Sequence, residues 1–186
     1  QRLIQTTLQE ANRLNSLCNN MLLSSQIEAS GFKISEEEIN FSELAGNCVQ
    51  DFTVRYPDKK LTAAIHPDIF TNGDRLLLQM AVNNLVDNAI KYSPKETIIM
   101  VELTQQKNNI YFLVKDEGKG IAAEEKKKVF DKFYRVGNTA TKGAKGTGLG
   151  LYLTKKIVQQ HNGNISVTDN VPSGCIFTIV LQSSDK

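Results

Sequence analysis

The sequence predicts an α+β fold: a two-layer sandwich with helices on one face of a mixed, mainly antiparallel sheet, preceded by a long N-terminal helix. Apolar residues recur at helical spacing in some segments and at alternate positions in others, without regular strand–helix alternation. Short polar turns join neighbouring β-rich segments, which favours antiparallel pairing. Hydrophobic residues make up 40% and charged residues 23% of the 186 residues, the balance of a soluble globular protein.

Residues 1 to about 29 predict one long helix, roughly 40 Å in length at 1.5 Å per residue. Its apolar positions follow a heptad-like spacing: Ile4, Leu8, Ala11, Cys18 and Leu22. A stripe of this length needs a partner. We expect a helical bundle in a dimer, and packing against the helix's own domain is the alternative. Gly31 is expected to end the helix.

The next segment predicts short strands around one helix. A strand is expected around Phe32 to Ile34, and a helix from Glu43 to about Val54. Phe41 and Ser42 have the residue types of a hydrophobic staple and an N-cap for that helix. Two further strands are expected at 61–66 and 69–71, followed by a turn at 72–74 that caps the central helix.

The second half predicts a hairpin, a long loop, a helix and a final pair of strands. The β-rich runs 97–104 and 110–115 flank an Asn-Asn turn and indicate an antiparallel hairpin. Residues 117–147 are rich in glycine and lack a steady period, and a loop of this length in a compact domain is usually functional. A helix at 149–160 and paired strands at 164–168 and 175–181 complete the chain.

The central helix, at 79–93, combines an apolar stripe with a polar surface that indicates chemistry. Asn84, Asn88, Lys91 and Tyr92 share one side of it at spacings of four, three and one. Asn is a poor helix former, so a pair of amides one turn apart suggests a ligand rich in oxygen. A metal ion carrying phosphates fits, because an amide oxygen can bind a hard cation and Lys a phosphate. A solvated polar face is the alternative.

Three further motifs follow in the glycine-rich half. Asp116 begins DEGKGI directly after a strand, where a carboxylate would accept a hydrogen bond from the exocyclic amine of a base such as adenine. GTGLGL, from Gly146, opens a helix and offers main-chain N–H groups to phosphate. FDKFYR lies between them, where the aromatic residues would pin the loop and Arg135 would meet a terminal phosphate. There is no GxxxxGK[ST] or GxGxxG pattern, which disfavours the commoner nucleotide-binding folds.

The bulk properties exclude several classes of protein. A net charge of +2 is too mild to indicate a nucleic-acid partner. No apolar run reaches the roughly 20 residues that span a bilayer. The three cysteines are scattered, which disfavours a zinc site or a disulfide framework and indicates a reducing compartment. Because the chain begins with Gln, we expect it to be a fragment of a longer protein.

The order NLVDNAIKYS, DEGKGI, FDKFYR and GTGLGL resembles the N, G1, F and G2 boxes of sensor histidine kinases, over about residues 32–182. This family belongs to the ATPase superfamily that includes gyrase, the MutL repair proteins and a chaperone. The resemblance implies a division into residues 1–30, the second helix of a dimerisation and phosphoacceptor hairpin, and 31–186, an ATP-binding catalytic domain. It implies transfer of the γ-phosphoryl of Mg-ATP to a histidine, then to an aspartate on a response-regulator receiver domain, within a cytoplasmic homodimer that reaches the membrane only through upstream segments.

The resemblance also implies roles at matching positions. Asn88 would bind Mg²⁺, with Asn84 near the phosphates, and both Asn84 and Arg135 would assist the transfer. Asp116 would bind the adenine amine. The remaining positions would shape the adenine pocket, bind phosphate or close over it as the end of a mobile lid: Lys91, Tyr92, Gly118, Gly120, Ile121, Gly146, Thr147, Gly148, Leu149 and Gly150.

The chain departs from the family pattern at two places. Cys175 follows Gly174 where the family usually has Ser or Thr, so a hydroxyl contact there would be lost or weakened. The only histidines, His66 and His161, lie outside the helical hairpin that holds the family's phosphoacceptor. A nucleotide-responsive binding module that never transfers phosphate is therefore the alternative. An ATP hydrolase of the repair or topoisomerase branch is disfavoured, since its carboxylate base would have to be Asp87.

Overall fold

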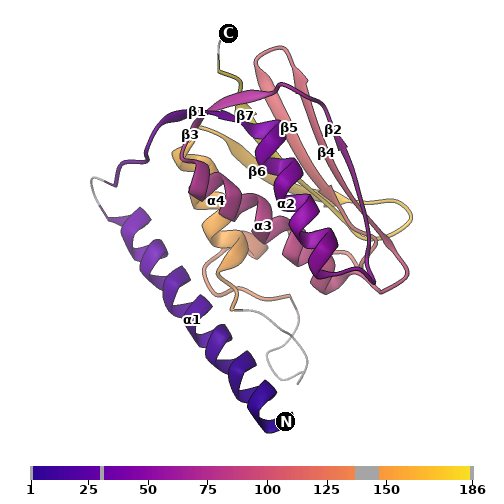
Figure 1. Ribbon diagram of the computed structural model, residues 1–186. Helices are drawn as coiled ribbons and strands as arrows, with labels where there is room; N and C mark the ends of the chain where they lie inside the picture. The colour runs from indigo at the N-terminus through magenta and orange to yellow at the C-terminus, as the bar shows by residue number, and fades with distance from the viewer. Residues whose placement is uncertain (1, 30–31, 137–146, 185–186) are drawn as a thin grey trace.

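The computed structural model describes residues 2–29, 32–136 and 147–184, and its main body is a two-layer α/β sandwich (Figure 1). The helices are α1 (Arg2–Glu28), α2 (Phe41–Arg55), α3 (Arg75–Tyr92) and α4 (Gly150–Gln160), with the short 3₁₀ helix η1 (Lys128–Phe130). The strands are β1 (Glu37–Asn40), β2 (Lys60–Ile65), β3 (Phe70–Gly73), β4 (Ile98–Gln106), β5 (Asn109–Lys115), β6 (Asn164–Asp169) and β7 (Cys175–Gln182). The predicted α+β class is confirmed.

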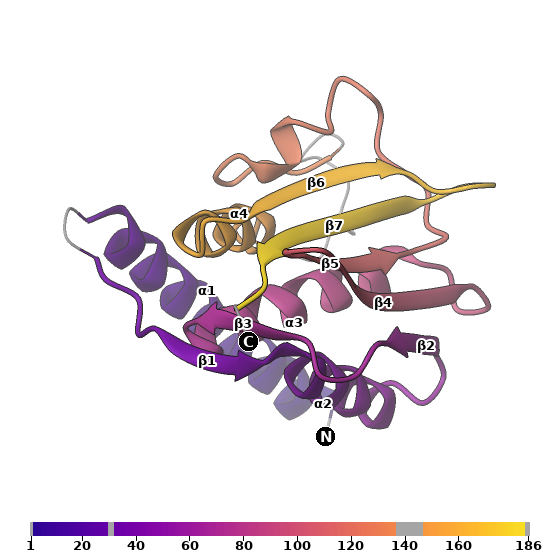
Figure 2. The same cartoon turned by 90° about the horizontal axis from the view of Figure 1, so that it is seen from above.

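The main sheet has the strand order β2–β4–β5–β7–β6. The β4–β5 and β6–β7 hairpins are antiparallel, as expected, and β5 pairs antiparallel with β7. β2 is the exception, because it runs parallel to its neighbour β4. A separate pair, β1–β3, lies beside the main sheet (Figure 2).

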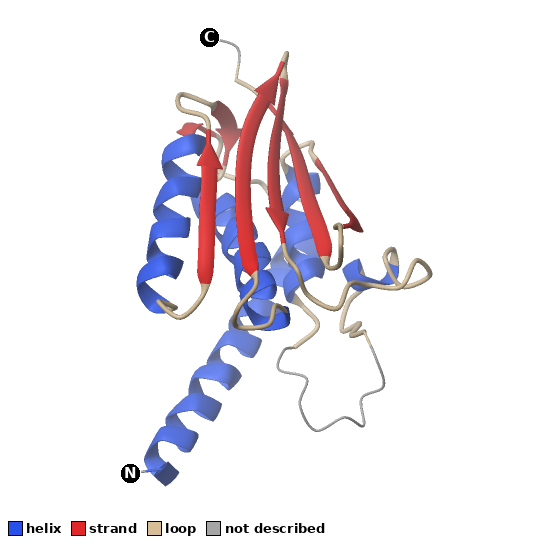
Figure 3. Ribbon diagram, turned by 90° about the vertical axis from the view of Figure 1, so that its right-hand side faces the viewer, coloured by secondary structure: helices blue, strands red, loops and turns tan. Residues whose placement is uncertain are grey.

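One face of the sheet is covered by α2, α3 and α4, and the other is open (Figure 3). The alternation of β4 shows why: Ile99, Val101 and Leu103 are fully buried, whereas Ile98 and Met100 between them are exposed. A strand places successive side chains on opposite faces, so this pattern buries one face only.

α3 is the central helix of the helical layer, and both of its ends are fixed. Asp74 caps it by accepting a hydrogen bond from the Leu77 N–H group at 3.1 Å. Val82, Leu85 and Val86 are fully buried. At the other end, the Lys59 ammonium donates to the main-chain oxygens of residues 93 and 94, where a positive charge also complements the helix dipole.

Two local predictions are wrong. Phe32 to Ile34 form no strand; the strand is β1, where Ile39 is buried and pairs with Thr71 of β3. Ser42 is not the N-cap of α2, because Asn40 accepts the Glu43 N–H group at 3.0 Å. The long-range pairing with β3 fixes the chain two residues before the expected helix start, which moves the cap.

α1 is confirmed as a long helix, and only its C-terminal end packs on the domain. Ser24 and Ile27 are buried, whereas Leu14, Met21 and Leu22 remain 60%, 48% and 63% exposed. The last turns of α1 thus pack on their own domain, which is the alternative to a dimer. For the remainder of α1, packing in a dimer stays a prediction. Gly31 lies outside the described residues. Among the described helices, none is both long and apolar enough to cross a bilayer.

Candidate functional site

The two asparagines of α3 have different surroundings. Asn84 Nδ2 donates to the Gly150 main-chain oxygen at 3.3 Å and lies 3.4 Å from Thr154 Oγ1, so it joins α3 to the first turn of α4. Asn88 is half-buried one turn further on, and its side chain has no hydrogen bond to any other described residue. The amide of Asn88 is therefore available to a ligand, while that of Asn84 sets the distance between two helices.

The end of α3 is polar and open to solvent. Lys91 is exposed and forms an ion pair with Asp87 one turn earlier. Tyr92 is 49% exposed. Phosphate binding by Lys91 would thus compete with Asp87, and because such exposed pairs contribute little in water, the exchange costs little.

Asp116 is held from several sides at the end of β5. Its main-chain N–H group donates to the Cys175 oxygen at 2.9 Å, which extends the β5–β7 pairing by one residue. Its main-chain oxygen accepts from Asn170 Nδ2 at 2.9 Å. Its carboxylate Oδ1 accepts the Gly118 N–H group at 2.8 Å. The strand end and the loop together fix the orientation of the carboxylate.

The Asp116 carboxylate is also electrostatically unusual. The residue is only 5% exposed, and no described cation forms an ion pair with it. Burial raises the pKa of Asp116, and the N–H groups of Gly118 and Cys175 oppose that shift by stabilising the charged form. A buried carboxylate without a cation is costly, and a perturbed acid of this kind is typical of functional sites.

Gly118 brings the loop against the end of α3. A methyl group at position 118 would lie 2.8 Å from the Tyr92 main-chain oxygen and 2.8 Å from Asp116 Oδ1, closer than carbon tolerates. Only glycine permits this approach. Gly120 follows with a φ of 74°, and Ile121 is partly buried against the core. The structure therefore brings DEGKGI next to the last turn of the central helix.

The segment that leads into α4 packs on the loop around Phe133. The Phe133 N–H group donates to the Gly148 oxygen at 3.0 Å, and Gly148, at a φ of 72°, lies so close to the Phe133 main chain that a side chain would clash. Thr147 Oγ1 accepts the Leu149 N–H group at 3.3 Å, and Leu149 is fully buried. These contacts hold the N-terminus of α4, and its N–H groups, at a defined position.

The loop itself is pinned partly as expected. Phe130 is buried, with its ring edge-on to Phe177 at 6.4 Å, whereas Phe133 is 51% exposed. Arg135 is half-buried immediately before residues 137–146, which include Gly146 and lie outside the described residues. The expected roles of Arg135 and Gly146 stay predictions.

Neither histidine is arranged to accept a phosphoryl group. The His161 ring is buried, its Nε2 accepts the Asp74 N–H group at 2.9 Å, and its Nδ1 lies 2.7 Å from the Ile157 oxygen. Nδ1 must then bear the proton, so no ring lone pair remains for a nucleophilic attack. His66 is exposed at the far end of β2, roughly 20 Å along that strand from Lys59 and the end of α3.

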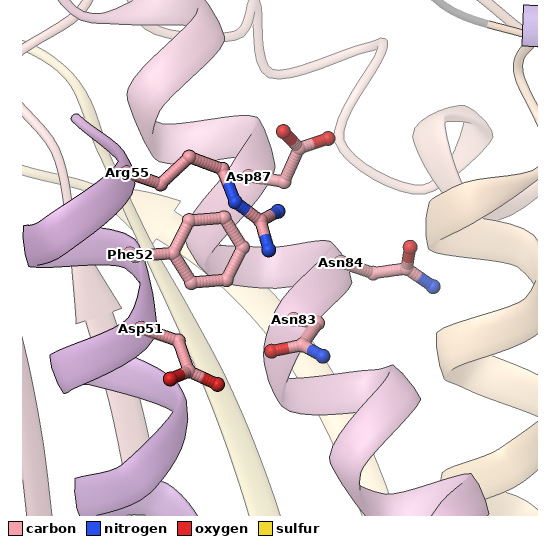
Figure 4. Close-up of a pocket in the computed structure, with 6 residues that line it drawn as sticks. All are labelled: Asp51, Phe52, Arg55, Asn83, Asn84 and Asp87. Carbon is pink, nitrogen blue, oxygen red and sulfur yellow. The ribbon is translucent and has the colours of Figure 1, made fainter. Parts of the chain in front are cut away.

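A polar hollow of about 260 Å³ lies on the other side of α3 (Figure 4). It is lined by Asp51, Phe52, Arg55, Asn83, Asn84 and Asp87. In Figure 4 the Asn84 amide points away from the α2 residues, in keeping with its contacts to α4. The hollow is lined by two residues of NLVDNAIKYS, Asn84 and Asp87, and by none of DEGKGI, FDKFYR or GTGLGL. We therefore place the functional site on the α4 side of the helix.

Sequence reasoning missed the residues that support this site. Asn170 and Lys59 bind main-chain oxygens far away in the sequence, and Thr154 meets Asn84 across two helices. Their residue types are ordinary in turns, strand ends and helices, and the sequence offers no signal for them.

Comparison with known proteins assigns the fold and the motifs to one family. Residues 73–185, more than half of the chain, match the family described as Histidine kinase-, DNA gyrase B-, and HSP90-like ATPase. The chain therefore belongs to this family of ATPases. The described architecture and the order of the four motifs agree with that membership.

Within this family, the chain is homologous to sensor histidine kinases. The sensor protein CiaH of Streptococcus pneumoniae is 44% identical over 117 residues, which cover 63% of this chain and 26% of that protein. SrrB of Staphylococcus aureus is 30% identical over 185 residues, covering 94% of this chain and 30% of that protein. The chain thus spans less than a third of the length of these curated relatives.

Solved structures give the same result. The mycobacterial sensor histidine kinase MprB is 29% identical with a TM-score of 0.73, covering 82% of this chain and all of that chain. The Acinetobacter baumannii histidine kinase AdeS, 24% identical, has a TM-score of 0.80 and covers all of this chain and 86% of its own, which shows a shared fold that includes α1. The chain is a histidine kinase-type ATPase domain of the sensor kinase class.

Proposed function

We propose that this chain is the catalytic part of a protein-histidine kinase, which transfers the γ-phosphoryl of Mg-ATP to a histidine that the chain itself does not supply. Residues 31–186 form the catalytic domain, and residues 1–30 form the second helix of the hairpin that bears the acceptor. The phosphoryl group then passes to an aspartate of a response-regulator receiver domain. The complete protein works as a homodimer in the cytoplasm, joined to the membrane through segments outside this chain.

The observation that carries the proposal is the buried carboxylate of Asp116. A carboxylate accepts hydrogen bonds only, so it favours a base with an exocyclic amine, such as adenine, and disfavours one with a carbonyl there. Its Oδ1 is already oriented by Gly118, so the acceptor is in place before the nucleotide arrives. The loop also lies against Tyr92, so the proposed adenine pocket would lie beside Asn88, one turn away on α3.

The residues around α3 fit a magnesium ion that is held mainly by the nucleotide. Among the described residues there is no cluster of three or more His, Cys, Asp or Glu side chains that would bind a metal by itself. Magnesium often uses few protein ligands together with substrate phosphates. The Asn88 amide oxygen, which has no partner among the described residues, suits that arrangement. The bound ion would neutralise charge on the phosphates.

The phosphates would lie between α3 and the N-terminus of α4. A helix N-terminus offers unpaired N–H groups and a positive dipole end, and no side chain caps the first turn of α4. Thr147, Gly148 and Leu149 lead into that end of the helix, which begins at Gly150. Lys91 and Arg135 would add positive charge. Phosphoryl transfer needs mostly positioning and charge neutralisation, which these groups would provide.

The direct test is transfer of label from γ-labelled ATP to a separate helical hairpin that bears an acceptor histidine. We expect acid-labile label on the hairpin when the chain and Mg²⁺ are present, and none on a hairpin with His replaced by Gln. The chain alone should stay unlabelled, since His161 is buried and both of its ring nitrogens are engaged. If the chain binds ATP and the hairpin never becomes labelled, the non-transferring module is the correct function.

A further inference from the structure

The last turn of α1 packs on the body through Ile27 and is also joined to it by the carboxylate of Glu28. Glu28 Oε1 accepts hydrogen bonds from the Lys132 ammonium at 2.9 Å, from Ser24 Oγ at 2.9 Å and from the Tyr152 hydroxyl. Lys132 also reaches Glu28 Oε2 at 3.2 Å. Lys132 and Tyr152 lie more than 100 residues further along the chain, so the contact is a long-range one.

The groups around Glu28 complement the charge of its carboxylate. The Tyr152, Lys132 and Ser24 donors lower the pKa of Glu28 to about 2. Burial, and then the Glu28 carboxylate, raise the pKa of Tyr152 to about 12, so the hydroxyl keeps its proton and donates it. The ammonium groups of Lys132 and Lys156 lie 5.6 and 5.8 Å from the centre of the Tyr152 ring, which adds positive charge around it.

The donors belong to the two segments that border the nucleotide site. Lys132 directly precedes Phe133, whose N–H group donates to Gly148 at the start of α4. Tyr152 lies in the first turn of α4, two residues after Gly150, which Asn84 contacts. A shift of the Glu28 carboxylate would therefore affect both the loop around Phe133 and the first turn of α4.

We propose that Lys132 and Tyr152 form a carboxylate-binding site whose ligand is Glu28 of the chain's own α1, and that its occupation couples the position of α1 to the nucleotide site. The coupling, unlike the site itself, rests on the proposed function. The carboxylate site is partly exposed, with Lys132 and Glu28 side chains 37% and 39% accessible. Such pairs are weak in water, so the carboxylate can leave the site and return while Ile27 stays packed against the core. Occupied, the site holds the domain against α1.

The site is tested by the distance between α1 and the body. Cys18 is exposed on α1 whereas Cys48 and Cys175 are buried, so a spin label at Cys18 pairs with one at an introduced Gln106→Cys on the exposed β4–β5 hairpin. Dilution with unlabelled protein removes signals between copies. We expect one narrow distance distribution in the parent and a broader one in Glu28→Gln and Tyr152→Phe.

The control variant is Glu36→Gln, which removes an exposed carboxylate on the same connection between α1 and the body. It should leave the distribution unchanged. If Glu28→Gln and Tyr152→Phe also keep the narrow parent distribution, the carboxylate site is refuted. Because Phe retains the ring and Gln the length of the side chain, neither change removes packing at this position.

The coupling is tested by the dissociation rate of a fluorescent ATP analogue with Mg²⁺. Glu28→Gln and Tyr152→Phe should change this rate in the same direction by about fivefold or more, and Glu36→Gln should not. A broadened distance distribution with an unchanged rate would refute the coupling and leave the site in place. If the parent does not bind the analogue, both the proposed function and the coupling are refuted. The distance measurement still tests the carboxylate site in that case.

Discussion

Replacing Asp116 by Asn should move nucleotide affinity and stability in opposite directions. The Asn side chain keeps an oxygen to accept the Gly118 N–H group, so the local geometry is retained. It places an amide NH₂ group where the other carboxylate oxygen had been. That group donates hydrogen bonds and cannot accept one from the adenine amine.

The size of the binding loss follows from the hydrogen bond that is removed. A hydrogen bond to a charged group contributes about 1.5–3 kcal/mol, and each 1.4 kcal/mol is a factor of ten in the dissociation constant. ATP should therefore bind about 10- to 150-fold more weakly. A loss of about 150-fold is favoured, because the amide NH₂ group of Asn and the adenine amine would be two hydrogen-bond donors facing each other. Isothermal titration calorimetry of parent and variant measures this.

The effect on stability has the opposite sign. Since burial raises the pKa of Asp116, the folded state holds the proton more tightly than the unfolded state, and the free energy of unfolding falls as pH rises through that pKa. At pH 7 the buried, charged Asp116 carboxylate lowers the free energy of unfolding, and a neutral Asn side chain does not. Urea unfolding should show the nucleotide-free variant at least as stable as the parent at pH 7, with the difference shrinking as the pH approaches the ordinary Asp value.

Two results would refute this reasoning. Parent-like ATP affinity in the variant would show that Asp116 does not bind the purine. A large loss of stability at pH 7 would show that the carboxylate is a structural group, and its burial would then need another explanation.

Further substitutions test other parts of the site. Asn88→Ala should weaken Mg-ATP much more than metal-free nucleotide in paired titrations, and equal losses would remove its metal role. Gly118→Ala forces a methyl group against the Tyr92 oxygen, so urea unfolding should show a loss of about 1–3 kcal/mol; an unchanged midpoint would mean that the loop and α3 are not in contact. His161→Ala leaves the Asp74 N–H group without its partner and should cost about 1–3 kcal/mol with ATP affinity kept, whereas lost affinity at full stability would contradict a structural role.

The sequence predicts the elements whose signals are local. The spacing of apolar residues defines α1, α3 and α4, and the β4–β5 hairpin follows from two alternating runs around an Asn-Asn turn. The β1–β3 pair and the parallel β2–β4 pairing depend on partners far away in the sequence, where neither period nor turn chemistry sets the register. This is why the expected strand at Phe32 to Ile34 is wrong.

The candidate site shows the same division. The motifs predicted which residues gather, since Asp116, Gly118 and Tyr92 do lie together, and Asn84 meets Gly150. The supports of the site escaped prediction because they bind main-chain atoms or cross the fold, as Asn170 does with Asp116. The same holds for Glu28, whose residue type at a helix end is ordinary and whose partners are defined only by the tertiary structure.

The most direct measurement is a crystal structure of the chain with Mg²⁺ and a non-hydrolysable ATP analogue. We expect the adenine amine within hydrogen-bond distance of the Asp116 carboxylate, the metal on the Asn88 amide oxygen, and the phosphates between α3 and the start of α4. A nucleotide bound in the hollow between Asp51, Arg55 and Asp87, or turned so that its base lies away from Asp116, would contradict the account.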